Sequence, residues 1–214
     1  AGRTFHFAHG AGAGMDSDWM NALTERLVKR GIRVLRFEFP YMRKRRRFEK
    51  KYPPDRAPKL LDCWREVIRG ASDHEGLFIG GKSMGGRMAS LIADESEVSG
   101  LICLGFPFHA PGKELGDRSA HLATIETPTL ILQGERDSLG SKASIAGVEL
   151  SSQVALHWLP DGDHGFKPRK KSGLSLEENL DRVAELIGGF VFQKPGLRTT
   201  RPGRLPGLGR EDVD

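Results

Sequence analysis

The chain has 214 residues, of which 38% are apolar and 29% charged, and its formal net charge at pH 7 is +5. This length suits one soluble domain with a sizeable core, and no apolar run reaches the roughly 18 residues of a membrane span. Cysteine occurs only as Cys63 and Cys103, in apolar settings, so zinc-binding and disulfide frameworks are excluded, and we expect a cytoplasmic protein without a metal or cofactor.

Short apolar runs bounded by Gly, Pro and Asp alternate with segments of helical period along the chain. This alternation predicts an α/β fold, a three-layer α/β/α sandwich around a mainly parallel sheet of about six strands. The predicted strands are Thr4–Ala8, Arg33–Phe37, Leu77–Gly80, Leu101–Leu104, Thr129–Leu132 and Ala155–Leu159.

Capping signals and apolar spacing predict the helices. Asp16 or Ser17 begins the first helix, whose buried face carries Trp19, Leu23 and Leu27 at a spacing of four. Gly31 then ends this helix. Further helices are predicted over about 60–69, from 84 to about 93, and from the capping box Ser175-x-x-Glu178 onward. Together these elements make a domain over residues 1–193.

From residue 194 the composition changes. Pro, Gly and Arg dominate the last segment, and few of its residues could pack into a core. We therefore expect residues 194–214 to form a flexible tail.

Most of the positive charge lies in one short segment. Arg43–Lys51 holds seven basic side chains and one acidic one, and the rest of the chain is close to neutral. The run predicts a solvated loop, which could attract an anionic substrate or surface. Binding of nucleic acid is disfavoured because stacking aromatics nearby are few (Phe48 and Tyr52) and no known binding module is present.

The most informative motif is Gly81-Lys82-Ser83-Met84-Gly85, which follows an apolar strand and precedes a predicted helix. Strand, Gly-x-Ser-x-Gly and helix in this order are typical of a nucleophile elbow, in which a strained turn exposes the serine hydroxyl. The flanking glycines keep side chains from colliding around the turn. Ser83 is therefore the candidate nucleophile.

The same residues also match the phosphate-loop pattern G-x-x-x-x-G-K-[ST], from Gly76 to Ser83. In a phosphate loop the four variable residues curl around the phosphates after the strand has ended. Here three of them, 77–79, belong to the predicted strand, and no later strand ends in an Asp placed to hold magnesium. Nucleotide binding is thus disfavoured.

An elbow serine needs a base and an acid, which follow it along the chain in the order acid, His. Asp137 comes just after the strand 129–132, and His164 lies in a tight turn after the strand 155–159. Both positions lie at the carboxyl edge of the sheet, where open α/β folds bind ligands. Asp161 and Asp163 are close to His164 but are better suited to shaping its turn.

The first predicted strand runs into a loop of small residues, His9-Gly10-Ala11-Gly12-Ala13-Gly14. A loop at this position supplies one oxyanion-hole amide in lipases and esterases, so we assign the backbone amides of Ala11 and Met84 to that role. The glycines also mimic a dinucleotide-binding fingerprint, but they lack its G-x-G-x-x-G spacing.

Together these motifs resemble the α/β-hydrolase superfamily over roughly residues 3–192. Within it, the chain resembles a group of predicted hydrolases related to dienelactone hydrolases, which includes a eukaryotic testis-expressed protein. The cues are the loop 9–12, Phe39-Pro40-Tyr41-Met42 followed by basic residues, the elbow, Pro107-Phe108-His109 and Gln133-Gly134-x-x-Asp137. Candidate substrate-pocket residues within these motifs are Gly12, Tyr41, Pro107 and His109.

The resemblance implies the same triad but no established substrate, and two departures bear on the site. The chain lacks room for the two strands that usually precede the His-Gly loop, and only the segment between Pro107 and Pro128 stands where a cap domain is usual. We therefore expect strand order 4-3-5-6-7-8 in the family's numbering and an open site for a small acyl ester, thioester or amide. The alternatives are a catalytically silent interaction protein and an anion or nucleic-acid binder that uses Arg43–Lys51.

Overall fold

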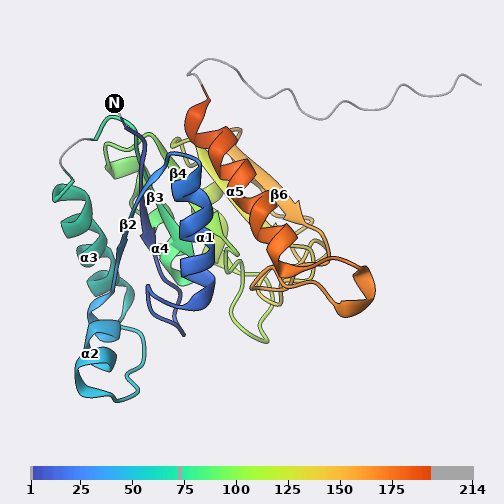
Figure 1. Ribbon diagram of the computed structural model, residues 1–214, viewed down its shortest axis with the longest axis horizontal. Helices are drawn as coiled ribbons and strands as arrows, with labels where there is room; N and C mark the ends of the chain where they lie inside the picture. The colour runs from blue at the N-terminus through green and yellow to red at the C-terminus, as the bar shows by residue number, and fades with distance from the viewer. Residues whose placement is uncertain (1, 72–73, 194–214) are drawn as a thin grey trace, which may run out of the picture.

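The computed structural model describes residues 2–71 and 74–193; the predicted tail, 194–214, lies outside them. Six strands form one parallel sheet in the order β2-β1-β3-β4-β5-β6 (Figure 1). Their bounds are β1 Thr4–Ala8, β2 Arg33–Phe37, β3 Leu77–Lys82, β4 Gly100–Leu104, β5 Thr129–Gly134 and β6 Val154–Leu159. The predicted fold class, strand positions and strand order are confirmed.

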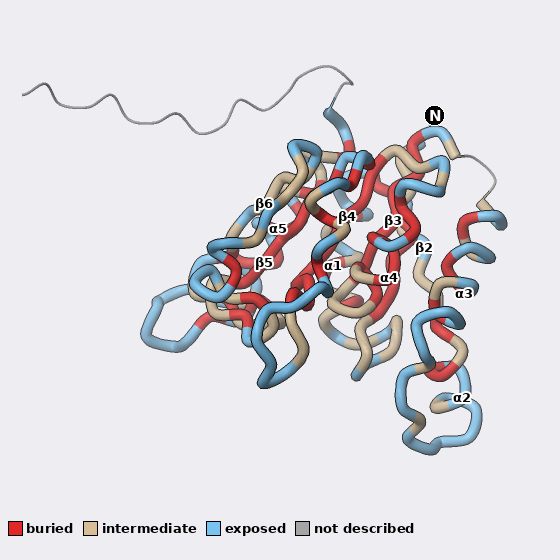
Figure 2. The backbone as a smooth tube through the Cα atoms, turned by 180° about the vertical axis from the view of Figure 1, so that it is seen from behind, coloured by how far each residue is buried: buried red, intermediate tan, exposed pale blue. Residues whose placement is uncertain are grey.

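The strands at the centre of the sheet are buried on both faces, as parallel strands covered by helices should be. Every residue of β4 and β5 is buried, and so are all residues of β3 except Lys82. Figure 2 shows these strands in red, inside an exposed shell of helices and loops. β3 and β5 each run two residues further than predicted, so that β3 leads directly into Ser83.

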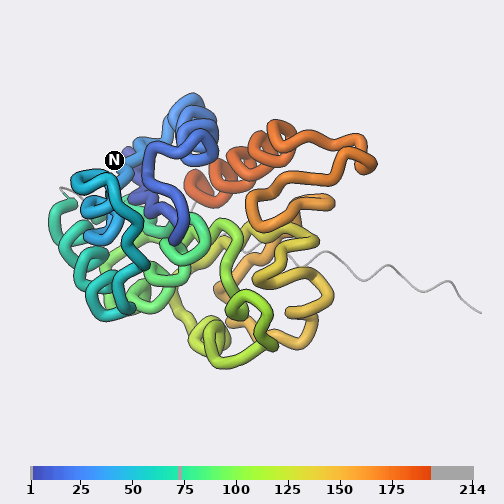
Figure 3. The backbone as a smooth tube through the Cα atoms, turned by 90° about the horizontal axis from the view of Figure 1, so that it is seen from below, coloured from blue at the N-terminus to red at the C-terminus, as the bar shows by residue number. Residues whose placement is uncertain are grey.

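Helices cover both faces of the sheet, so that the molecule has three layers. α1 (Asp18–Lys29) and α5 (Leu176–Phe192) pack on one face of the sheet, where Leu23, Leu27 and Ile187 are fully buried. In Figure 3, α1 (blue) and α5 (orange) lie on one side of the sheet. On the other face lie α3 (Ala57–Arg69) and α4 (Met84–Ser90), with Trp64 at the centre of the core. No helix within residues 2–71 and 74–193 has both the length and the apolar character needed to cross a bilayer.

Local signals define the ends of α1 and α5. The Ser17 side chain accepts a hydrogen bond from the Met20 amide, and Ser175 and Glu178 form the predicted reciprocal capping box. Gly31, just after α1, has φ +80°, a conformation that favours glycine. These three predictions from the sequence are confirmed.

Most of the basic segment is helical rather than the predicted loop; only residues 49–51 lie outside the helix. Pro40–Phe48 forms α2, which extends beyond the carboxyl edge of the sheet (Figures 1 and 2). Pro40 occupies the first turn, where its missing N–H costs nothing, and Arg and Lys are good helix formers. Tyr41 and Met42, on the inner face of α2, are buried against the rest of the protein, and this packing stabilises the helical conformation.

The elbow helix is shorter than predicted. α4 ends at Ser90 and is followed by a 3₁₀ turn, Ala93–Glu95. The amides of Leu91 and Ile92 bond three residues back rather than four, and the Ser90 hydroxyl donates to the Arg87 carbonyl oxygen at 2.7 Å. Both contacts tighten the last turn and compete with continuation of the helix.

Candidate active site

Ser83 lies on a strained turn between β3 and α4. Its backbone has φ 51° and ψ −116°, in the left-handed half of conformational space, which non-glycine residues rarely adopt. The turn is held by its own backbone: the Ser83 amide donates to the Leu104 carbonyl oxygen at 2.8 Å, and the Arg87 amide donates to that of Ser83 at 3.0 Å. Strain that is overdetermined by its surroundings is typical of functional sites, and here it presents the serine at the sheet edge.

The elbow glycines allow α4 to pack directly against the end of β1. A Cβ atom on Gly81 would lie 2.4 Å from the Ala8 carbonyl oxygen, and one on Gly85 would lie 2.6 Å from that of His9. Both distances are shorter than any real contact of a Cβ atom with backbone oxygen. Glycine is therefore required at both positions by this close approach.

We expect Gly85→Ala to destabilise the protein by at least the 1–3 kcal/mol or so that overpacking usually costs, because two backbone segments would have to separate. Gly189→Ala is the matched control: Gly189 lies inside α5, and a Cβ there meets nothing within 4 Å. That change should stabilise α5 by up to about 1 kcal/mol. Urea unfolding of both variants checks the prediction, and equal stabilities would contradict it.

The structure places Asp137 beside the imidazole of His164. Asp137 is fully buried after β5, and its Oδ2 and Oδ1 lie 2.8 and 3.0 Å from His164 Nδ1. Oδ2 also accepts from Gln133 Nε2 at 2.9 Å, and Oδ1 accepts from the Leu139 amide at 2.8 Å. A carboxylate with these three donors has no rotational freedom, and it orients the histidine ring.

This contact assigns the protons of the imidazole. When Nδ1–H donates to Asp137, the neutral ring has a lone pair on Nε2, as a general base requires. The His164 side chain is 31% exposed, and it lines a cavity of about 370 Å³ together with Ser83. Ser83 and His164 share this cavity without a hydrogen bond between them; catalytic contacts are often long until substrate is bound.

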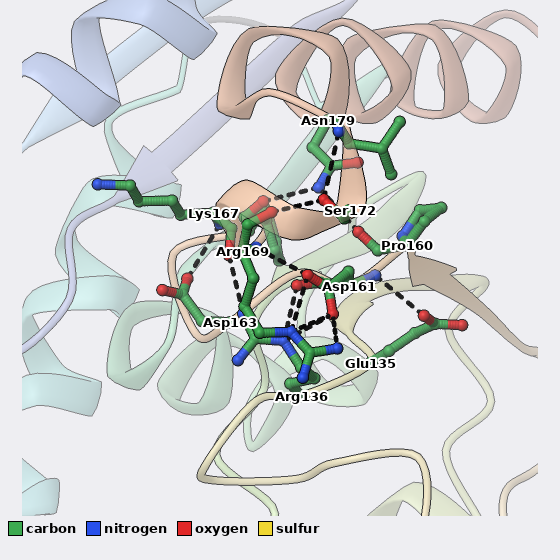
Figure 4. Close-up of polar contacts among 11 residues, drawn as sticks. Glu135, Arg136, Pro160, Asp161, Asp163, Lys167, Arg169, Ser172 and Asn179 are labelled. Atoms are coloured by element: carbon green, nitrogen blue, oxygen red, sulfur yellow. Dashed lines mark hydrogen bonds and ion pairs between the residues drawn. The ribbon is translucent and has the colours of Figure 1, made fainter.

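The turn that carries His164 has no regular secondary structure, yet each of its carbonyl oxygens from Pro160 to Lys167 accepts a hydrogen bond. Figure 4 shows the contacts of this turn around Pro160, Asp161 and Lys167. Asn179 of α5 donates to two of them, and the Trp19 indole of α1 donates to the Gly165 oxygen at 2.9 Å. Side chains from α1 and α5 thus help to fix the position of His164.

Asp161 and Asp163 shape this turn, as the sequence indicated. Asp161 accepts from Arg169 and Arg136, and the hydrogen bond from Arg169 lowers its pKa to about 2. Asp163 accepts from the amides of Gly165 and Lys167 at 2.8 and 3.0 Å. Both carboxylates are occupied within the turn (Figure 4), and Asp137 is the one bonded to His164.

The loop after β1 is held by its carbonyl oxygens. His9 is buried, which lowers its pKa; its Nδ1 bonds to the Gly10 oxygen at 2.6 Å and its Nε2 accepts from the Phe39 amide at 3.1 Å. The Tyr41 hydroxyl, whose pKa is raised to about 12 by burial, donates to the Ala11 oxygen at 3.0 Å. Within the described residues the amides of Ala11 and Met84 donate to no protein group, so both remain available to a ligand oxygen.

Of the four predicted pocket residues, only Gly12 lines the cavity beside Ser83. Tyr41 is 1% exposed and supports the loop from beneath, so its assignment to the pocket was wrong. Pro107 is buried, and neither it nor His109 lines the cavity at Ser83 or the neighbouring one.

Two residues make contacts at the site that the sequence did not predict. Helical spacing indicated a core position for Trp19, but the indole lines both the cavity at Ser83 and a neighbouring one of about 580 Å³ beyond His164. The motif indicated Lys82 only as part of the elbow, whereas the ammonium bonds to the His164 carbonyl oxygen. No local pattern signals either contact. The strand conformation of 77–82 also leaves no phosphate loop at Gly76–Ser83.

Comparisons with known proteins agree with this architecture. A family model described as an alpha/beta hydrolase domain matches residues 1–192. Among solved structures, an alpha-beta serine hydrolase homologue from Coxiella burnetii superposes with a TM-score of 0.64 at 19% identity, covering 87% of this chain and 83% of that one. An esterase domain from a Rhodothermus marinus protein gives 0.61 at 17% identity, covering 88% and 85%. A dienelactone hydrolase from Anabaena variabilis gives 0.60 at 21%, covering 89% and 85%.

Proposed function

We propose that this chain, which belongs to the α/β-hydrolase domain family, hydrolyses a small acyl ester through Ser83, His164 and Asp137. The family makes the protein a hydrolase. One observation carries the finer assignment: a buried Asp137 bonded at 2.8 Å to the imidazole that shares a cavity with the strained Ser83.

The proposed reaction has two halves. In the first, His164 Nε2 takes the hydroxyl proton as Ser83 Oγ bonds to the acyl carbon, and the amides of Ala11 and Met84 stabilise the oxyanion. The carbon–oxygen bond of the ester then breaks, and the proton passes from His164 to the departing alcohol. In the second half, His164 Nε2 takes a proton from a water molecule as the water oxygen bonds to the acyl carbon. The bond between that carbon and Ser83 Oγ then breaks, His164 returns the proton to Ser83 Oγ, and the acid leaves.

The size of the site supports a small acyl group. The cavity at Ser83 measures about 370 Å³, and its lining from Gly10 to Ala13 is small and largely uncharged. Only the segment between β4 and β5, with a 3₁₀ turn at Asp117–Ala123, stands where a cap would be inserted. Thioesters and amides share the acyl carbon on which this chemistry acts, and they are secondary candidates.

The direct test is labelling with a fluorophosphonate probe, followed by peptide mapping. We expect a single adduct, on Ser83, that is absent from heat-denatured protein and that forms more slowly in the presence of a hydrolysable ester. A panel of p-nitrophenyl esters of increasing acyl length then measures kcat/KM for each. Labelling elsewhere, or equal labelling of denatured protein, would contradict the assignment.

The exposed cations of α2 bear on the charge of the substrate. Arg46 forms ion pairs with Glu38 and Asp16. Arg45 donates to the carbonyl oxygens of Tyr52, Ala11 and Gly12. Both arginines therefore stabilise the position of α2 against its neighbours. Arg43, Lys44 and Arg47 are exposed on the same helix, which contacts the loop that lines the cavity through Tyr41 and Arg45. A positive potential at a cavity mouth raises the rate of encounter with anions.

We expect the variant with Arg43, Lys44 and Arg47 all changed to Gln to lose kcat/KM for an anionic ester but not for a neutral ester of the same length. The difference should shrink as ionic strength rises above about 0.15 M, where the Debye length falls below about 8 Å. The matched control changes Lys29, Arg30 and Arg33, exposed at the opposite edge of the sheet, to Gln. If both triple variants lose kcat/KM for the anionic ester to the same extent, the cations of α2 have no special role in attracting the substrate.

A further inference from the structure

Lys82, the last residue of β3, connects the nucleophile strand to the turn that carries the base. Its Nζ donates to the carbonyl oxygen of His164 at 2.5 Å, across 82 positions of sequence. It immediately precedes Ser83, so a single side chain joins the backbone at the elbow to the backbone of the histidine. The proposed triad needs neither this amine nor this bond.

The fold encloses the ammonium on several sides. Nζ lies 5.6 Å from the centre of the Trp19 ring and 5.8 Å from that of Phe166, within the range of cation–π attraction. A Cβ on Gly105 would lie 2.9 Å from Nζ and 3.1 Å from the His164 oxygen, and Gly105 has φ +64°. Glycine after β4 therefore leaves the space that the lysine occupies.

The charged neighbours of Nζ come from two other strands. Asp137 follows β5 and Asp163 follows β6, and both carboxylates favour the charged amine. Burial acts in the opposite direction and dominates, so that the pKa of Lys82 falls to about 8. At neutral pH most of the molecules therefore hold a cation here, which makes the bond to the carbonyl oxygen charge-assisted.

This bond differs from the others that hold the turn. The carbonyl oxygens of Gly165 and Phe166 accept from Trp19 of α1 and Asn179 of α5, which fix the turn against helices. Lys82 alone among the described side chains ties the turn to β3, the strand that carries Ser83. The lysine therefore links the backbone of His164 to the strand of Ser83, in addition to the contacts that hold the turn against α1 and α5.

We propose that Lys82 is a positioning residue, which fixes His164 relative to Ser83 through the carbonyl oxygen of His164. The proposal rests on the function proposed above. Asp137 holds the imidazole ring from one side, and Lys82 holds the backbone of the same residue from the other. Loss of the lysine leaves the ring its partner but lets the turn shift, and a displacement of about 1 Å costs on the order of 10² in rate.

The test replaces the amine and then restores it. Lys82→Cys is alkylated either with 2-bromoethylamine, which rebuilds a lysine-length side chain ending in an amine, or with 1-bromopropane, which gives the same length ending in methyl. Position 82 lines the cavity at Ser83, which gives the reagents access, whereas Cys63 and Cys103 are buried and burial raises both thiol pKa values, so they should react little. Wild type carried through both reactions controls for that, and Lys170→Cys, at an exposed lysine nearby, controls for alkylation itself.

For a small neutral ester we expect kcat of Lys82→Cys to fall about 10²-fold, with KM changed less than about threefold. The aminoethylated protein should regain most of kcat, and the propylated protein none. Full kcat in the cysteine or propylated form, or equal rescue by both reagents, overturns the proposal. Should the cysteine variant not fold, Lys82→Met against wild type gives the same comparison, and undiminished kcat again overturns it.

A Ser83→Ala sample in the same assay separates the two proposals. If Ser83→Ala retains activity, the serine mechanism fails, whatever Lys82 does. If Ser83→Ala is inactive and Lys82→Cys keeps full kcat, only the positioning role fails.

Discussion

Replacement of Ser83 by alanine is expected to lower kcat for ester hydrolysis by about 10⁶-fold and to abolish fluorophosphonate labelling, because the acyl-enzyme cannot form. The fold should not change. The elbow is held by the backbone amide and carbonyl of Ser83, which bond to Leu104 and Arg87, and alanine makes both bonds equally well. Alanine also adopts the turn at φ 51° with the same difficulty as serine.

Steady-state kinetics and urea unfolding on the same preparation measure both effects. Ser152→Ala, at an exposed serine after β5, is the matched control and should behave as wild type. Turnover that survives in Ser83→Ala at more than about a thousandth of the wild-type rate would remove Ser83 from the mechanism, since the oxyanion hole and binding alone leave only 10³–10⁴ or so over water.

Asp137→Asn is expected to lower kcat by about 10⁴-fold through the wrong histidine tautomer. In the native site both carboxylate oxygens accept: Oδ2 from Gln133 and Oδ1 from the Leu139 amide, with His164 Nδ1 within reach of both. An asparagine has only one acceptor oxygen. Whichever way the amide is turned, its NH₂ group faces a donor that needs an acceptor, and the His164 proton moves to Nε2, where it blocks the base.

The control is Asp163→Asn, one residue from the histidine. Asp163 accepts from the amides of Gly165 and Lys167, so this change should loosen the turn and cost far less activity than Asp137→Asn. Near-normal activity in Asp137→Asn with a severe loss in Asp163→Asn would transfer the acid role to Asp163.

The sequence by itself determined the features that neighbouring residues encode. Apolar runs separated by turn residues predicted all six strands, and the capping box at Ser175 and Glu178 located the start of α5. The chain order of Ser83, Asp137 and His164 placed all three candidates at the carboxyl edge, because each follows the end of a parallel strand. Backbone conformation at such positions depends on residues within a turn or two, so a single sequence is enough.

Tertiary structure alone decided which side chains meet. The charge of residues 43–51 indicated a solvated loop, yet the burial of Tyr41 and Met42 and the pairing of Arg46 with Glu38 make α2 a helix. Likewise, helical spacing explains why Trp19 is near the core but not that its indole holds the turn of His164.

Lys82 shows most directly why the sequence did not predict contacts between distant residues. Its position next to Ser83 is a local fact that the sequence displays, and it also matched a phosphate-binding pattern. The partner of its amine, a carbonyl oxygen 82 positions later, is set by the order β3-β4-β5-β6 and by glycine at position 105, which leaves the space between them. Conformation is encoded by neighbours along the chain, whereas a contact between distant residues exists only once the sheet has brought the strand ends together.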